Sequence, residues 1–73
     1  MDYKFIEFCR DNSYTGDIMV TSYGVDIRVR KGNYTAGYSI DEERLKEARN
    51  KSVIFDEAFE VLKRMIDNAE IQN

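Results

Sequence analysis

Histidine, tryptophan and proline are absent from this 73-residue chain, and cysteine occurs once, at Cys9. Histidine is the side chain whose unperturbed pKa lies nearest neutrality, so its absence removes imidazole proton transfer and imidazole metal ligation together. One cysteine cannot build a zinc site, which takes about four nitrogen or sulfur ligands, and it cannot form an internal disulfide. A site made of carboxylates alone needs a pocket, for which a chain this short has little room. We therefore expect binding and not catalysis, with no catalytic residue, no metal and no cofactor.

The length fits one domain over residues 1–73, in which folding buries roughly 60% of the surface of the unfolded chain. With 42% hydrophobic and 12% aromatic residues, the chain is too apolar for a disordered tail. Neither a secretory signal nor a membrane span is visible, so we expect a cytoplasmic protein that does not enter a membrane. Because neither a disulfide nor a metal is available, packing must supply the stability, and help from self-association as a homodimer stays open.

The net charge of −3 comes from the second half of the chain. Residues 1–40 hold five acidic and five basic side chains, whereas residues 41–73 hold nine acidic and six basic ones. Affinity for nucleic acid depends on Lys and Arg side chains that neutralise phosphates. The acidic surplus therefore disfavours a duplex-binding protein and favours a partner protein with a basic surface.

The segment Tyr3–Cys9 carries the first ambiguous pattern. Its aromatic and β-favouring residues predict a strand. Phe5, Phe8 and Cys9 would also line one side of a helix, so a helix remains the alternative.

Alternating patterns predict the following strands. Short apolar or alternating runs occupy Ile18–Thr21, Val25–Arg30 and Tyr34–Ile40, and turn residues separate them at Tyr23-Gly24 and at Lys31–Asn33. Connections this short join antiparallel neighbours, so the pattern indicates a meander of three or four strands.

The second half of the chain predicts two helices. Ser39 and Glu42 have the spacing of a capping box before a short helix, which should end near residues 50–52. A longer amphipathic helix follows, with an apolar stripe of Phe55, Ala58, Phe59, Leu62, Met65, Ile66 and Ala69. The expected class is α+β: an antiparallel three- to four-stranded meander packed against a C-terminal amphipathic helix, with a short preceding helix. The core should contain Ile27, Val29, Phe59, Leu62 and Ile66.

An acidic cluster at the start of the short helix is the first candidate binding surface. It consists of Asp41, Glu42, Glu43 and Glu47, which either begin a solvated helix or mimic phosphates for a basic groove. The i,i+4 pairs Glu42–Lys46 and Glu47–Lys51 should neutralise part of it. Some negative field should survive.

Two tyrosines are candidates for an apolar anchor beside these acids. Tyr14 lies in a predicted loop and Tyr23 beside a turn glycine, where neither is obviously buried. Exposed tyrosine is favoured at interfaces because it gives much contact area for few rotatable bonds. Cys9, in contrast, is expected to be a small buried apolar residue.

The alternative site is basic. Arg28, Arg30 and Lys31 are expected on the outward side of one strand, near Tyr23 and Tyr34, where they could contact nucleic acid. The opposing interpretation is a set of cross-strand ion pairs on an open sheet face.

The chain combines a small size, an acidic surplus, the order of three strands and a helix from Asp17 to Asn73, and the hairpin Asp26–Tyr34. In these features it resembles the small acidic phage and mobile-element proteins of the anti-CRISPR inhibitor type. This resemblance implies a non-enzymatic, phage-encoded inhibitor that binds the basic surface of a host nucleic-acid enzyme, such as a CRISPR effector nuclease. The same strand order with arginine on the strands also resembles the arm-type DNA-binding domains of phage integrases. Those domains are usually basic and this chain is not. A structural or self-associating phage protein is the remaining alternative.

Overall fold

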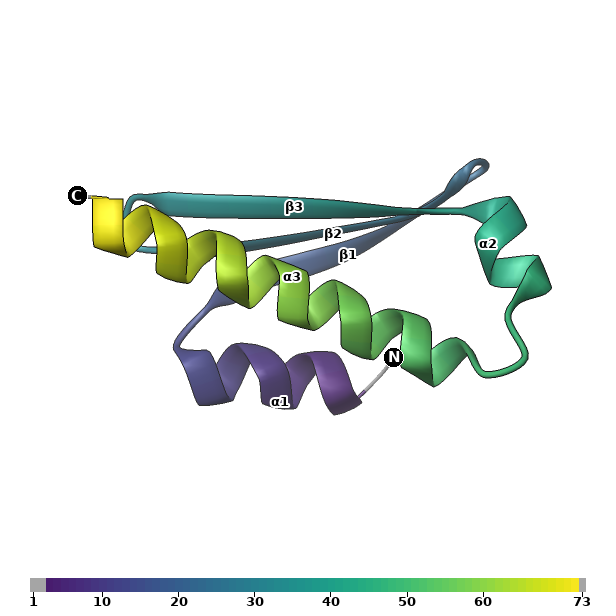
Figure 1. The fold of residues 1–73 in the computed structure, drawn as a ribbon, viewed down its shortest axis with the longest axis horizontal. Coiled ribbons are helices and arrows are strands. Elements are labelled where there is room, and N and C mark those ends of the chain that lie inside the picture. The colour runs from purple at the N-terminus through teal and green to yellow at the C-terminus, as the bar shows by residue number, and fades with distance from the viewer. Residues whose placement is uncertain (1–2, 73) are drawn as a thin grey trace.

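The computed structural model describes residues 3–72 and contains one three-stranded sheet with helices on one side of it (Figure 1). The elements follow the order α1 (Tyr3–Asn12), β1 (Thr15–Thr21), β2 (Gly24–Lys31), β3 (Tyr34–Asp41), α2 (Glu42–Glu47) and α3 (Lys51–Gln72). The strands lie in the order β1-β2-β3, and both neighbouring pairs are antiparallel. The predicted α+β meander is therefore confirmed, with three strands.

The sheet has an inner face toward α1 and α3 and an outer face without a helix (Figure 1). On the inner face the buried residues are Ile27 and Val29 of β2 and Ala36 and Ile40 of β3. Between them, the alternate residues Arg28, Thr35, Gly37 and Ser39 are exposed on the outer face. This one-sided burial matches the alternation of the strands, because successive side chains point to opposite faces of a sheet.

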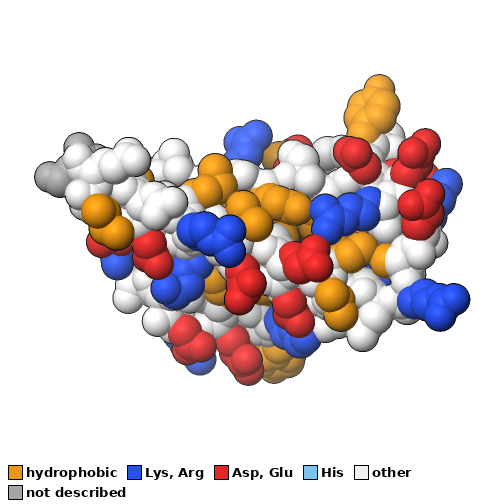
Figure 2. Space-filling view, viewed as in Figure 1, with side chains coloured by type: hydrophobic (Ala, Val, Ile, Leu, Met, Phe, Trp, Pro, Cys, Tyr) orange, Lys and Arg blue, Asp and Glu red, His pale blue; other side chains and the backbone are white. Residues whose placement is uncertain are grey.

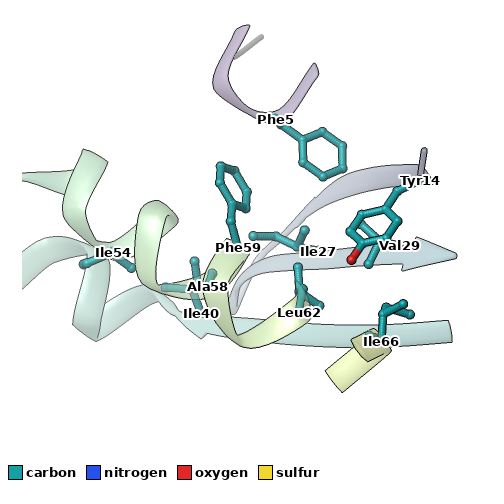
Figure 3. Close-up of a cluster of buried hydrophobic side chains, with 11 residues drawn as sticks. Phe5, Tyr14, Ile27, Val29, Ile40, Ile54, Ala58, Phe59, Leu62 and Ile66 are labelled. Atoms are coloured by element: carbon teal, nitrogen blue, oxygen red, sulfur yellow. The ribbon is translucent and has the colours of Figure 1, made fainter. Parts of the chain in front are cut away.

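Helix α3 supplies the other half of the core (Figure 3). The buried residues Ile54, Ala58, Leu62 and Ile66 recur every four positions and form one side of the helix, with Phe59 beside them. All five residues predicted for the core are buried. The predicted stripe was wrong at one position, because Met65 is 45% exposed, and it omitted Ile54.

The segment predicted as a first strand is the helix α1, so the strand prediction was wrong. Phe5 is buried, and Phe8 and Cys9 are half-buried, as the helical alternative required. The ring of Phe8 stacks on that of Phe59, with centroids 4.8 Å apart, and Phe5 packs 5.8 Å from the same ring. Packing on α3 thus outweighs the β preference of these aromatic residues, a preference that itself depends on context.

Helix α1 ends in a Schellman motif, which explains where the chain turns toward β1. Ser13 takes a left-handed φ of 59°. The Tyr14 N–H donates to the Cys9 carbonyl at 2.8 Å and the Ser13 N–H to the Arg10 carbonyl at 3.4 Å. The hydrophobic contact that accompanies this motif is present, because the rings of Phe8 and Tyr14 meet edge to face at 5.3 Å.

The predicted capping box at α2 is not formed. Asp41, and not Ser39, occupies the N-cap, and its side chain makes no capping hydrogen bond. The Ser39 hydroxyl instead donates to Asp26 across the outer face at 2.6 Å. A break between the helices is present as predicted, but it lies earlier than residues 50–52, at residues 48–50, since α2 ends at Glu47 and α3 begins at Lys51. Asn50 caps α3 by accepting a hydrogen bond from the Ser52 N–H at 3.0 Å.

Candidate binding surface

The four predicted acids gather at one end of the molecule, which we call the acidic corner: Asp41, Glu42, Glu43 and Glu47. All four are exposed, Asp41 at the end of β3 and the other three on α2. Acidic side chains cluster at this end of the molecule, where Figure 1 draws α2 (Figure 2). The sequence therefore located these side chains correctly as a surface group.

Salt bridges neutralise little of the acidic corner. Glu42 pairs with Lys46 at 3.0 Å, as its i,i+4 spacing predicted. The predicted pair between Glu47 and Lys51 is not formed, because α2 ends at Glu47 and the helical geometry that would join them is lost. Asp41, Glu43 and Glu47 make no ion pair with any residue in the part of the chain that the structure describes. Three carboxylates therefore remain available to a partner.

Arg44 fixes the acidic corner to the rest of the fold. Its guanidinium donates to the Tyr38 hydroxyl of β3 at 3.0 Å and to the Glu57 carboxylate of α3 at 2.7 Å. The hydrogen bond to Tyr38 is the main cause that raises the pKa of Arg44, and the Glu57 carboxylate raises it further. Because both contacts link α2 to other elements, the short helix has a defined orientation.

Tyr23 lies beside the acidic corner, at the tip of the hairpin between β1 and β2. Its side chain is 83% exposed. Its carbonyl accepts a hydrogen bond from the Glu42 N–H at 2.8 Å, which joins the hairpin to the first residue of α2. The neighbouring Gly24 has a φ of 149°, and a Cβ there would lie 2.0 Å from the Ile40 carbonyl oxygen. The tight backbone at Gly24 therefore holds the hairpin tip that carries Tyr23 against the start of α2.

Tyr14 does not belong to this surface, so its prediction as an exposed anchor was wrong. Only 9% of it is exposed, and it is part of the core cluster beneath α1 (Figure 3). Burial is the main cause that raises the pKa of the Tyr14 hydroxyl, and the nearby Asp67 carboxylate raises it further. The end of the helix at Asn12-Ser13 is the signal that would have placed it, because the residue after a Schellman turn packs back on its helix.

The structure divides the predicted basic set between the two faces of the sheet. Arg28 and Arg30 are exposed on the outer face, and neither makes an ion pair within residues 3–72. They border a shallow hollow of about 660 Å³. Lys31 points the other way and pairs with Glu70 of α3 at 3.2 Å. The alternation of the strand already places Lys31 opposite Arg30, so this separation was predictable.

Acidic residues share the outer face with these two arginines. Asp17 of β1 lies opposite Arg28 in the register, and Asp26 follows on the same side of β2. The predicted aromatic neighbours are elsewhere, since Tyr34 is half-buried on the inner face and Tyr23 belongs to the hairpin tip. The outer face is therefore mixed in charge and lacks the stacking platform that the sequence suggested.

No group of three or more His, Cys, Asp or Glu residues that could hold a metal ion occurs in residues 3–72. Cys9 belongs to α1 and is half-buried, and burial raises the pKa of its thiol. A thiol with a raised pKa is a poor nucleophile at neutral pH. In the same range, no helix is both long and apolar enough to cross a bilayer.

Comparisons with protein-family models, with curated proteins and with solved structures gave no match. The arguments about function therefore depend on the surface itself.

Proposed function

We propose that this chain is a non-enzymatic binding module that uses the acidic corner and Tyr23 to bind a basic surface on a protein partner. One observation carries the proposal. The backbone hydrogen bond from the Glu42 N–H to the Tyr23 carbonyl fixes the hairpin tip, whose tyrosine is 83% exposed, to the start of α2. Three carboxylates of the acidic corner make no ion pair in the described chain. A flat ring next to uncompensated charge combines a contact anchor with electrostatic attraction.

The charges and the ring have different physical roles in this proposal. Complementary charge increases the rate of association more than it fixes affinity, so binding slows as salt screens it. The tyrosine ring contributes buried area and therefore acts mainly on dissociation. Because Arg44 orients α2, little conformational entropy is lost when the partner binds.

The more specific form of the proposal is an inhibitor of a nucleic-acid enzyme, acting in the cytoplasm of the host cell if the protein is phage-encoded. Such enzymes bind phosphates with Lys and Arg, and exposed carboxylates can occupy the same basic groove. The resemblance to small anti-CRISPR inhibitors supports a CRISPR effector nuclease as the kind of enzyme to test first.

Direct nucleic-acid binding is the second candidate, favoured by the absence of ion pairs at Arg28 and Arg30 in the described chain. Two arginines neutralise few phosphates, and Asp17 and Asp26 share their face. Lys31 is paired with Glu70 and does not add to them. The acidic corner is therefore the stronger candidate.

A pair of matched variants tests the proposal. The corner variant D41N/E43Q/E47Q removes three exposed carboxylates, and the control D11N/E7Q/E60Q removes three others that also lack ion pairs within residues 3–72. The tagged wild type is used to isolate a partner, and the purified partner is then titrated against each variant by biolayer interferometry at increasing salt. We expect the corner variant to associate more slowly, Tyr23→Ala to dissociate faster, and the control to bind as the wild type does.

Two results would contradict the proposal. One is equal binding by the corner variant and the control variant. The other is binding of duplex or single-stranded DNA in an anisotropy titration at about 50 mM salt, where phosphate contacts are strong, that Arg28→Ala and Arg30→Ala abolish. The second result would establish the nucleic-acid alternative.

A further inference from the structure

Strand β1 is the most exposed strand of the sheet. It lies at one edge and pairs with β2 alone. None of its seven residues is buried, whereas β2 and β3 each have two buried residues. Two of its apolar side chains are in solvent, since Met19 is 50% exposed and Val20 is 80% exposed. This edge therefore presents both backbone groups and apolar side chains without a cover.

The features by which proteins protect such an edge are missing from β1. It contains no Lys, no Arg and no Pro, and its pairing with β2 runs through seven consecutive residues without a bulge. Its one charge is Asp17. The other edge strand, β3, differs because it buries Ala36 and Ile40 against the helices and leads directly into α2. An unprotected edge strand is a template for another strand.

We propose that β1 pairs antiparallel with β1 of a second copy of this chain, about a twofold axis at Ile18, and so forms a continuous six-stranded sheet. Ile18 is the middle residue of β1, so this register pairs all seven residues of both strands. A twofold axis makes the interface the same surface on both copies, which closes the assembly at a dimer. The inference goes beyond the proposed function and does not depend on it.

The side chains agree with this register. On the inner face, the exposed Val20 of one copy lies opposite Gly16 of the other. Gly16 has no side chain, and Val29 and Phe5 lie against it, so Val20 meets an apolar surface. On the outer face, Asp17 of one copy lies opposite Met19 of the other, and no two carboxylates are directly opposed. Like charges directly opposite would destabilise the pair.

The dimer should be weak and should leave the acidic corner free. A seven-residue strand is about 23 Å long, and a strand pair of this length buries less than the ~1,600 Å² of a stable interface. Because the two strands run in opposite directions, the two hairpin tips lie at opposite ends of the six-stranded sheet. Each copy can therefore still present Tyr23 and the acidic corner to a partner.

Opposite charges at one position test the register. Met19 is half-exposed and lies opposite Asp26 of its own chain, so Met19→Asp should be slightly less stable than Met19→Lys, but both should fold, which circular dichroism checks. In the dimer, each new side chain lies opposite Asp17 of the other copy, twice by symmetry. We expect Met19→Lys to lower the dissociation constant of the dimer and Met19→Asp to raise it. Each change should be roughly two- to thirtyfold, because two cross-strand pairs contribute to it. Sedimentation equilibrium over about a hundredfold range of concentration measures it.

The matched controls are Ile71→Lys and Ile71→Asp, which make the same change in net charge at an 81% exposed position of α3. They separate pairing with Asp17 from a change in overall repulsion, and we expect them to leave the dissociation constant unchanged. Amide exchange of residues 15–21 should also slow as the wild-type concentration rises. Any of three results would overturn the proposal. The wild type could stay monomeric over the whole range of concentration, the Met19 variants could match their Ile71 controls, or the amide exchange could be independent of concentration.

Discussion

Replacing Leu62 by alanine tests the packing of α3 on the sheet. Leu62 has no exposed surface and lies on the side of α3 that faces the buried strands (Figure 3). Truncating a buried leucine costs about 2–5 kcal/mol, which combines lost transfer free energy with the cavity left behind. At about 0.05–0.15 kcal/mol per residue, a chain of 73 residues has about 4–11 kcal/mol of stability in total. The variant should therefore lose a large share of its free energy of unfolding.

Met65→Ala is the matched control for this experiment, because Met65 lies three residues further along the same helix and is 45% exposed. We expect a change of about 0.5 kcal/mol or less for the control. For Leu62→Ala, the melting temperature should fall by about 8–40 °C, at about 4–8 °C for each kcal/mol in a domain of this size. Urea and thermal unfolding followed by circular dichroism measure both variants. Equal losses for the two variants would mean that α3 is rotated and that the packing described above is wrong.

Gly16→Ala should destabilise the protein by about 1–3 kcal/mol, because its Cβ would lie 2.5 Å from the Arg28 carbonyl oxygen, as in an overpacked core. Gly37→Ala is the control, because the atom nearest to its added Cβ would be 3.8 Å away. We expect the control to have wild-type stability or a gain of up to about 1 kcal/mol. Equal losses for the two variants in urea unfolding would contradict the close packing described at Gly16. Burial raises the pKa of Cys9 above its ordinary value of 9.0, so iodoacetamide should alkylate the folded protein more slowly than the urea-unfolded chain at the same alkaline pH. Because the pKa of the thiol is higher in the folded protein, the stability linked to the neutral thiol is complete below the unfolded pKa and is lost as pH rises through the folded pKa. Cys9→Ala should therefore weaken the fall in stability at alkaline pH, measured by urea unfolding. An unchanged fall would refute this prediction.

The strands were predictable because their local signals agree with their packing. In β2 the alternation of Val25, Ile27 and Val29 with charged residues specifies which side faces the core, and two buried positions confirm it. Helix α1 was not predictable in the same way. Its aromatic residues favour a strand locally, and the helix is stabilised by Phe59, which lies 51 positions after Phe8 in the sequence. A contact so distant in the chain leaves no periodic signal near α1.

The candidate site was predictable in its charges and less so in its aromatic anchor. Exposure of the acids follows from their charge, because unpaired carboxylates stay in water. Whether a loop tyrosine is buried depends on the element before it, and the mistaken strand at residues 3–9 left Tyr14 in solvent. The link between Tyr23 and Glu42 joins two segments through backbone atoms, which composition and periodicity do not report.

The restriction of α1 and α3 to one face of the sheet also determines how the protein tolerates sequence change. Inner-face positions such as Ile27 accept few residues, because each volume change is felt in a close-packed core. Outer-face positions such as Thr35 have no neighbouring layer and accept many. Across β2 and β3, tolerance in a mutational scan should alternate with a period of two residues. In β1 it should be high except at Gly16, where a Cβ would meet the Arg28 carbonyl oxygen, and at Ile18, which packs against the core. Sequences related to this one would therefore keep the inner-face half of β2 and of β3 while the outer-face half diverges freely.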